Sequence, residues 1–143
     1  MNKPTVIIDT NIFISALIAK TKGNPKAIIN AFEEERFLLV VSPLLLKELE
    51  ETVKGPELSQ VISLSDAFNL IALIEIKAKI VHPTPQKIKL SRDPKDNIVL
   101  EAAFACHPKP AYIVSGDNDL LVLKKFHNIP IIPPAEFIKL LCK

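Results

Sequence analysis

The sequence is short of the residues that mark several protein classes. It contains two cysteines, Cys106 and Cys142, and no CxxC pair. This excludes a disulfide-rich scaffold and a zinc site built from cysteines, and two isolated thiols fit a reducing cytosol. The chain has three glycines and no GxGxxG phosphate-binding loop. Gly116 is expected only to permit a tight turn.

Strong charge of one sign is also missing. The formal net charge is +2, and Arg36 and Arg92 are the only arginines, so bulk charge gives no argument for nucleic-acid binding. The most apolar stretch, residues 64–81, is interrupted by Asp66, Glu75, Lys77 and Lys79, which excludes a membrane span. No signal peptide is visible. We therefore expect a cytoplasmic protein without a membrane anchor.

The composition that is present suits a folded domain. Hydrophobic residues make up 48% of the chain and charged residues 24%, which supports a substantial core and an ordinary polar surface. No repeat, linker or low-complexity stretch divides the sequence. We expect one domain over residues 1–143.

Short β-branched runs alternate with segments that have helical periodicity. This alternation predicts an α/β fold, with a mostly parallel central sheet. Asn24 and Ser42, each followed by proline, are predicted helix caps. The expected strands are residues 6–8, 37–41, 80–81, 112–115 and 130–132, and the expected helices are residues 12–19, 25–35, 43–53, 65–79, 94–106, 118–125 and 134–141.

Acidic residues follow two of these strands. Asp9 comes directly after residues 6–8, and Asp117 comes two residues after Ser115. In parallel sheets the functional crevice lies beyond the carboxyl ends of the strands. A structural alternative stays open, because Asp9 and Asp117, with Asp119, also suit the caps of the helices they precede. Asp96, near the start of another helix, equally suits the helix dipole.

Glu48 is harder to explain as a surface residue. Its helical neighbours at three and four positions are Leu44, Leu45, Glu51 and Thr52, whereas Glu50 and Glu51 each have lysines at that spacing. Glu48 therefore needs a partner from elsewhere in the fold. A metal ion and a lysine distant in sequence are the two candidates.

If these carboxylates converge, their mutual repulsion requires a cation. Oxygen ligands without histidine or thiolate suit Mg²⁺ or Mn²⁺. Such an ion activates water and neutralises a phosphate, which makes a phosphodiester or phosphate ester the expected substrate.

Four stretches in this order resemble the PIN-domain nucleases, and in particular the PIN-like toxins of prokaryotic toxin–antitoxin pairs. They are VIIDTNIFISAL, SPLLLKELEETV, RDPKDNIVLEAA and IVSGDNDLLVLKKFHNIPIIPPAEFI, and together they span nearly the whole chain. The resemblance implies a Rossmann-like three-layer α/β/α sandwich with about five parallel strands. It also implies Mg²⁺- or Mn²⁺-dependent endonucleolytic hydrolysis of single-stranded RNA.

The resemblance further implies a set of site residues and partners. The metal-binding acids match Asp9, Glu48, Asp96 and Asp117, with Asp119 as an additional acid, while Asn11 and Ser115 match polar residues that orient the acids or a bound water. The implied partners are RNA, a second copy of the chain in a homodimer, and a small antitoxin protein. Apolar helices such as residues 137–141 are candidates for an interface.

Basic residues and histidines carry weaker predictions. Lys87, Lys89, Arg92 and Lys95 precede Asp96 and form either a solvated loop or a contact with the phosphate backbone. Lys124 and Lys125 are expected to be exposed at a helix end. His82, His107 and His127 have no metal-ligand spacing.

Three other functions remain alternatives on the sequence. A phosphatase of the haloacid-dehalogenase type also places an aspartate after its first strand, but it uses a second aspartate where this chain has Asn11. A receiver-like module usually has paired acids at the end of its first strand, where this chain has one. A catalytically silent RNA-binding domain would bind RNA without turnover.

Overall fold

The computed structural model describes residues 3–18, 23–84 and 94–142, and within these it has the predicted α/β architecture. In chain order the elements are β1 (Thr5–Ile8), α1 (Thr10–Ile18), α2 (Asn24–Glu33), β2 (Leu38–Val41), α3 (Pro43–Lys54), α4 (Leu64–Lys77), β3 (Lys79–Ile80), α5 (Pro94–Ala105), β4 (Tyr112–Val114), α6 (Asn118–Leu121), β5 (Lys125–Phe126), β6 (Ile129–Ile132) and α7 (Pro134–Leu141). No helix in these ranges is both long and apolar enough to cross a membrane.

The described strands form one six-stranded sheet in the order β3-β2-β1-β4-β6-β5. All neighbours are parallel except β5 and β6, which are antiparallel. The first strand, β1, lies between β2 and β4, so the chain winds outward from β1 in both directions. The change of direction between β1 and β4 is the switch point at which parallel α/β sheets form their ligand crevices.

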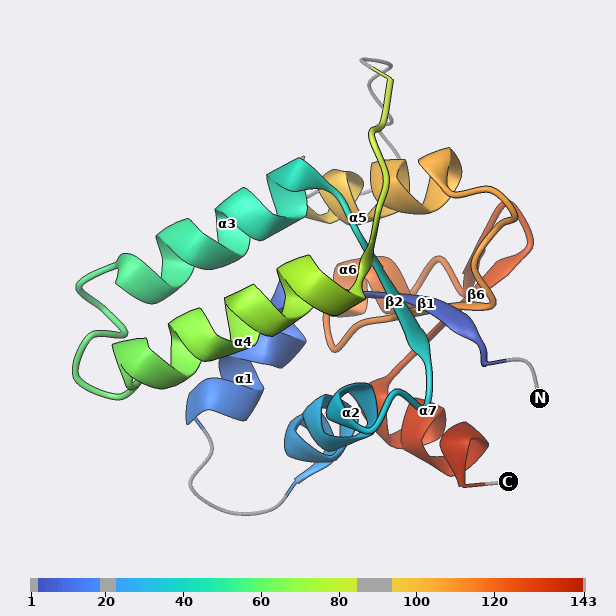
Figure 1. Ribbon diagram of the computed structural model, residues 1–143. Helices are drawn as coiled ribbons and strands as arrows, with labels where there is room; N and C mark the ends of the chain where they lie inside the picture. The colour runs from blue at the N-terminus through green and yellow to red at the C-terminus, as the bar shows by residue number, and fades with distance from the viewer. Residues whose placement is uncertain (1–2, 19–22, 85–93, 143) are drawn as a thin grey trace.

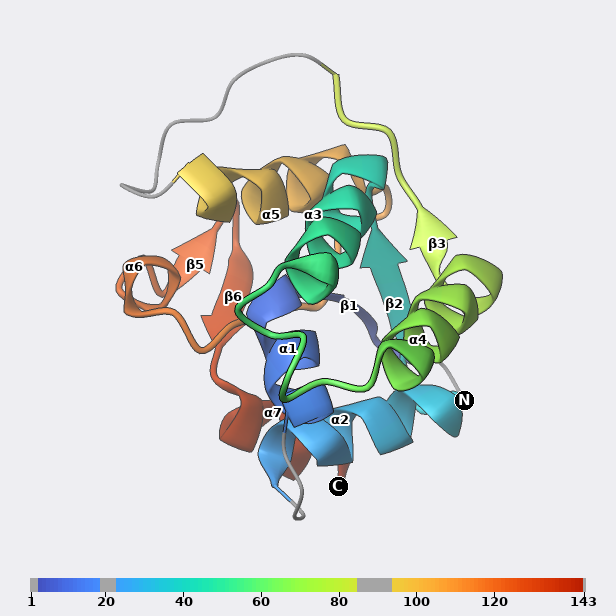
Figure 2. The same ribbon diagram turned by 90° about the vertical axis from the view of Figure 1, so that its left-hand side faces the viewer.

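Helices cover both faces of the sheet, as the two ribbon views show (Figures 1 and 2). Successive strand residues point to opposite faces. Thus Val6 and Ile8 pack in a core with α1, α2, α4 and α7, whereas Ile7 packs in a second core with α5 and the end of α6. The three-layer α/β/α sandwich is confirmed.

Helix α3 takes part in both cores because it lies across the end of the sheet. Leu45 near its start packs on the α5 side, whereas Leu49 and Val53 pack on the side of α1 and α4. Glu48 lies between these two sets of anchors. The apolar contacts of α3 therefore hold Glu48 near the carboxyl ends of the strands.

The predicted helix caps have different outcomes. The Ser42 hydroxyl accepts a hydrogen bond from the Leu45 N–H at 3.2 Å, as expected for a cap. The prediction for Asn24 was wrong, because α2 already begins at Asn24 and Gly23 occupies the cap position without a side-chain hydrogen bond.

The predicted helix over residues 118–125 was also too long. Helix α6 ends at Leu121, and Lys125 belongs to a short strand that pairs with β6. His127 and Asn128 form the two-residue turn between them, with φ of 47° and 66°, as hairpin turns of type I′ require. This hairpin adds a sixth strand to the five expected.

The apolar residues of α7, a candidate interface on the sequence, contact the core of the same chain. Phe137 is fully buried and meets Phe37 edge-to-face, with ring centroids 5.2 Å apart. Ile138, Leu140 and Leu141 pack partly buried against the same core. The apolar residues of α7 therefore stabilise the monomer.

The C-terminus of α2 contains an unfavourable backbone conformation. Glu35 has a φ of 58°, and the Arg36 N–H donates to the Ala31 carbonyl while the Glu35 N–H donates to the Phe32 carbonyl. This is a Schellman motif with glutamate at the position that normally holds glycine. An L-residue there costs about 1–2 kcal/mol.

We expect Glu35→Gly to raise the free energy of unfolding by about 0.5–1 kcal/mol, measured by urea denaturation, because glycine adopts positive φ without a steric cost. Glu34→Gly removes the same charge at a φ of −80° and should instead be destabilising. Equal shifts in the two variants would mean that charge, and not backbone conformation, controls this helix end.

Candidate active site

The site lies where β1 and β4 end side by side. Asp9 and Ser115 are the residues that directly follow these two strands. The Asp9 N–H donates to the Val114 carbonyl at 2.9 Å, and the Ser115 N–H donates to the Ile132 carbonyl at 3.0 Å. These bonds extend the sheet ladder by one residue and fix the backbone from which both side chains project.

The Ser115 hydroxyl connects the two acidic segments. It donates to Asp9 Oδ2 at 2.9 Å and accepts from the Asp117 N–H at 3.0 Å. Ser115 is fully buried and Asp9 is 4% exposed. A buried hydroxyl that uses both its donor and its acceptor fixes the position of both neighbours.

Asp9 and Asp117 also make the same helix-capping bond. Asp9 Oδ1 accepts from the Asn11 N–H at 3.2 Å, and Asp117 Oδ1 accepts from the Asp119 N–H at 2.9 Å. The capping alternative is therefore correct for both residues. It does not compete with a role in the site, because a carboxylate has several acceptor positions.

A third acid comes from α5. Asp96 lies in the first turn of α5 and is 4% exposed. One oxygen from each of Asp9, Asp96 and Asp117 lies within 4.8 Å of the other two. Three carboxylates at this separation repel one another, and their all-oxygen chemistry fits a hard divalent cation such as Mg²⁺ or Mn²⁺.

Glu48 lies beside this group without being one of its three members. Its Oε1 accepts a hydrogen bond from the Thr10 hydroxyl at 3.0 Å. The two neighbouring glutamates behave as the sequence indicated: Glu50 pairs with Lys54 at 2.8 Å, and Glu51 with Lys47 at 4.0 Å. The sequence argument that Glu48 meets a group distant along the chain is thus supported, with a threonine as one such group.

The remaining predicted site residues surround the group of three. Asn11 contributes its backbone N–H to Asp9, while its side chain is exposed. Asp119 is half-buried at the start of α6. Lys87, Lys89 and Arg92 lie outside the described residues, as does the side chain of Lys95.

The buried cysteine and the three histidines are not part of the group of three acids. Burial raises the pKa of the Cys106 thiol, although nearby Lys79 acts in the opposite direction, so Cys106 is a poor nucleophile. His82 and His107 are exposed and line a hollow of about 230 Å³ beside Glu101. His127 is exposed in the hairpin turn. In the part of the chain that the structure describes, no histidine joins a group of three possible metal ligands.

The prediction for Gly116 was wrong. None of the glycines in the described ranges has a positive φ, and a side chain at position 116 would meet nothing within 4 Å. The turn beside Asp117 is held by the Ser115 hydroxyl instead. Lys124 and Lys125 are exposed as predicted, but they follow α6 and do not end it.

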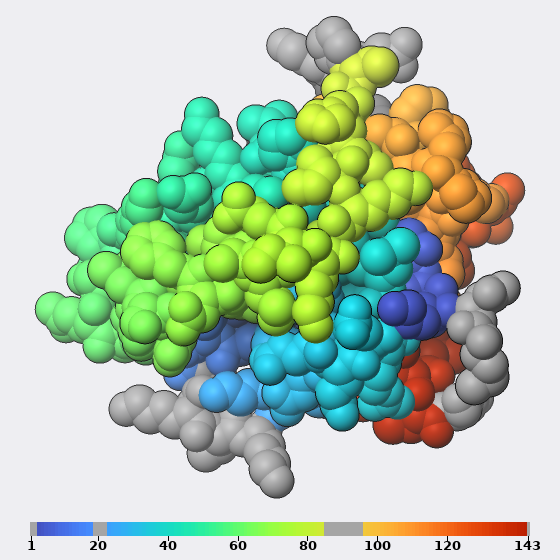
Figure 3. All heavy atoms as spheres, in the orientation of Figure 1, coloured from blue at the N-terminus to red at the C-terminus, as the bar shows by residue number. Residues whose placement is uncertain are grey.

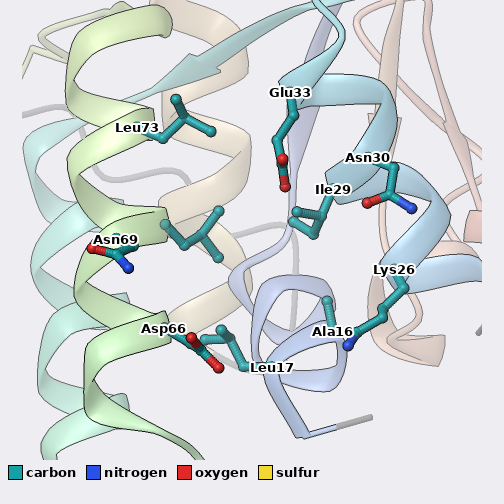
Figure 4. A pocket seen from close by; sticks show the side chains of 10 residues that line it. Ala16, Leu17, Lys26, Ile29, Asn30, Glu33, Asp66, Asn69 and Leu73 are labelled. Carbon is teal, nitrogen blue, oxygen red and sulfur yellow. The ribbon is translucent and has the colours of Figure 1, made fainter. Parts of the chain in front are cut away.

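A larger hollow of about 440 Å³ lies between α4 on one side and α1 and α2 on the other (Figure 4). Leu17, Ile29 and Leu73 are among its apolar lining residues, and Lys26, Glu33 and Asp66 are its charged ones. None of the candidate acids lines it. Helix α4 also runs across the front of the face shown in Figure 3, and it exposes Leu64, Phe68 and Ile76.

Comparisons with known proteins agree with this geometry. Residues 5–119 match the family model described as PIN domain. The chain is 32% identical to uncharacterized protein MJ1680 of Methanocaldococcus jannaschii, with 96% of this chain and 91% of that protein covered. The fold is similar to the crystal structure of PAE2754 from Pyrobaculum aerophilum, with a TM-score of 0.65 at 11% identity, over 98% of this chain and 90% of that one.

The group of three acids predicts an unusual response to charge removal. Asp117→Asn keeps a side chain that caps α6 and removes one of three repelling charges. We expect its Tm without metal to rise by roughly 2–4 °C, equivalent to about 1 kcal/mol. Added Mg²⁺ or Mn²⁺ should raise the Tm of the wild type and have little effect on the variant.

Asp66→Asn is the matched control for this measurement, because Asp66 is an exposed acid in the first turn of α4. It should retain the full metal-induced shift. An identical shift in wild type and Asp117→Asn would exclude Asp117 as a metal ligand.

Proposed function

The chain belongs to the PIN-domain family, and we propose that it is a metal-dependent endoribonuclease that cleaves single-stranded RNA. The observation that carries the proposal is the convergence of Asp9, Asp96 and Asp117 oxygens within 4.8 Å, at the switch point of the sheet. The family is one of nucleases, and this group of carboxylates suits a divalent metal. RNA as substrate is supported by the sequence resemblance.

Each acid has a defined task in this proposal. A divalent cation, when bound, activates water and neutralises charge on the scissile phosphate. Asp9, Asp96 and Asp117 would hold it through carboxylate oxygens, with Mg²⁺ or Mn²⁺ as the matching ions. Ser115 keeps Asp9 in place through its 2.9 Å hydrogen bond, so the ligand has little freedom to rotate.

Other residues would act around the metal. Glu48 and Asp119 add negative charge at the margin of the site and can accept hydrogen bonds from water. Asn11 has an exposed side chain next to Asp9, where it can contact substrate or orient a bound water. Lys87, Lys89, Arg92 and Lys95 precede Asp96 in the chain and are proposed to contact the RNA backbone, which would make binding weaken with salt.

The direct test is cleavage of a labelled single-stranded RNA with and without Mn²⁺. We expect Asp96→Asn to lower kcat by at least about 100-fold, because it removes a charged metal ligand, and to leave the circular dichroism spectrum unchanged. Asp66→Asn should cleave at the wild-type rate. Undiminished cleavage by folded Asp96→Asn would refute these roles, and tight RNA binding by the wild type without any turnover would indicate a silent binding domain.

We also propose that the chain is the toxin of a toxin–antitoxin pair and acts as a homodimer. The motif resemblance supports the toxin role, and the exposed apolar residues of α4 are compatible with association. Induced expression should arrest bacterial growth, whereas expression of Asp9→Asn should not. Normal growth under wild-type expression, at a protein level matched to the variant, would contradict the toxin role. A neighbouring gene for a short DNA-binding protein would identify the antitoxin candidate.

A further inference from the structure

The two residues at the start of α1, Asp9 and Thr10, contact two different parts of the site. Asp9, immediately before the helix, accepts a hydrogen bond from the hydroxyl of Ser115, the residue that follows β4. Thr10, the first residue of α1, contacts α3 instead: its hydroxyl donates to Glu48 Oε1 at 3.0 Å. Two adjacent residues thus connect the end of β1 to two different acidic segments.

The contact between Thr10 and Glu48 is built into the protein interior. Thr10 is 5% exposed, and Glu48 is half-buried between the core residues Leu45 and Leu49. A hydroxyl that donates to an ionised carboxylate forms a charge-assisted hydrogen bond, which is stronger than a neutral one. Thr10 and Glu48 are 38 positions apart in the sequence, so the fold, and not local helix geometry, creates this contact.

We propose that Thr10 is a positioning residue that acts through Glu48. Its hydroxyl holds the Glu48 carboxylate beside the group of three acids, where the carboxylate would add negative charge next to a divalent cation held by Asp9, Asp96 and Asp117. This role rests on the proposed metal-dependent function. It assigns Glu48 a place outside the directly ligating set, because the converging oxygens belong to Asp9, Asp96 and Asp117.

Loss of such an outer contact typically weakens metal binding or activity by about 10–100-fold. Thr10→Val keeps the shape of the side chain and removes the donor. We expect it to weaken Mn²⁺ binding, measured by electron paramagnetic resonance, by about 10-fold. Thr10→Ser keeps the donor and should recover most of the affinity.

A second threonine provides a matched control. Thr52 donates its hydroxyl to the backbone carbonyl of Glu48 at 2.7 Å, so it contacts the same residue but not its carboxylate. Thr52→Val should bind Mn²⁺ as the wild type does. An equal loss of affinity in Thr52→Val and Thr10→Val would overturn the proposal, because it would point to a general disturbance of α3.

The decisive experiment is a double-mutant cycle with Glu48→Gln, read by Mn²⁺ affinity on the folded full-length protein. If Thr10 acts through the Glu48 carboxylate, Thr10→Val should cost about 10-fold in the wild-type background and less than about 2-fold in Glu48→Gln. Equal costs in both backgrounds would overturn the positioning role. Thr10→Ala takes the place of Thr10→Val in the cycle if the valine variant fails to fold.

The outcomes separate this inference from the proposed function. Normal Mn²⁺ binding with no effect of Thr10→Val overturns the positioning role and leaves the metal site intact. Failure of the wild type to bind Mn²⁺ contradicts both. Mn²⁺ binding without RNA cleavage contradicts the proposed substrate, while the affinity cycle still decides the role of Thr10.

Discussion

The parallel pairing of β1 with β4 is the constraint on which the site depends. Both strands are buried on both faces, and neighbouring strands in a sheet lie about 4.8 Å apart. The residues that follow them must therefore be neighbours, although more than 100 positions separate Asp9 from Ser115 in the chain. Asp117 follows Ser115 by two residues, so the Asp9 and Asp117 carboxylates also lie close together. The hydrophobic burial of β1 and β4 provides the free energy that offsets their repulsion.

The two aspartates that precede α1 and α6 stabilise these helices and also belong to the group of three acids. Asp9 and Asp117 each give one oxygen to a backbone N–H of the following helix, and capping bonds of this kind contribute about 1 kcal/mol each. Ser115 connects the two starts through one hydroxyl. Part of the electrostatic cost of the acid cluster is therefore offset by hydrogen bonds that exist without metal.

Much of this could be predicted from the sequence, because strand runs and acids at their ends are local patterns. The architecture, the location of Asp9 and Asp117 and the unusual surroundings of Glu48 are of this kind. The resemblance implied that Ser115 orients an acid or a bound water, and its bond to Asp9 is of that kind. The Thr10–Glu48 contact was not predicted, because it depends on how α3 packs. The β5–β6 hairpin was missed because His127 and Asn128 adopt positive φ without a glycine to indicate it.

The capping bonds also change how related sequences should be interpreted. An aspartate at position 9 or 117 is useful to the fold even in a protein that has lost its enzymatic chemistry, so its presence alone says little about activity. Glu48 stands in the middle of α3, where it caps no helix end. Among relatives of this chain, the residue at position 48 is therefore a more discriminating marker of an intact site than either aspartate.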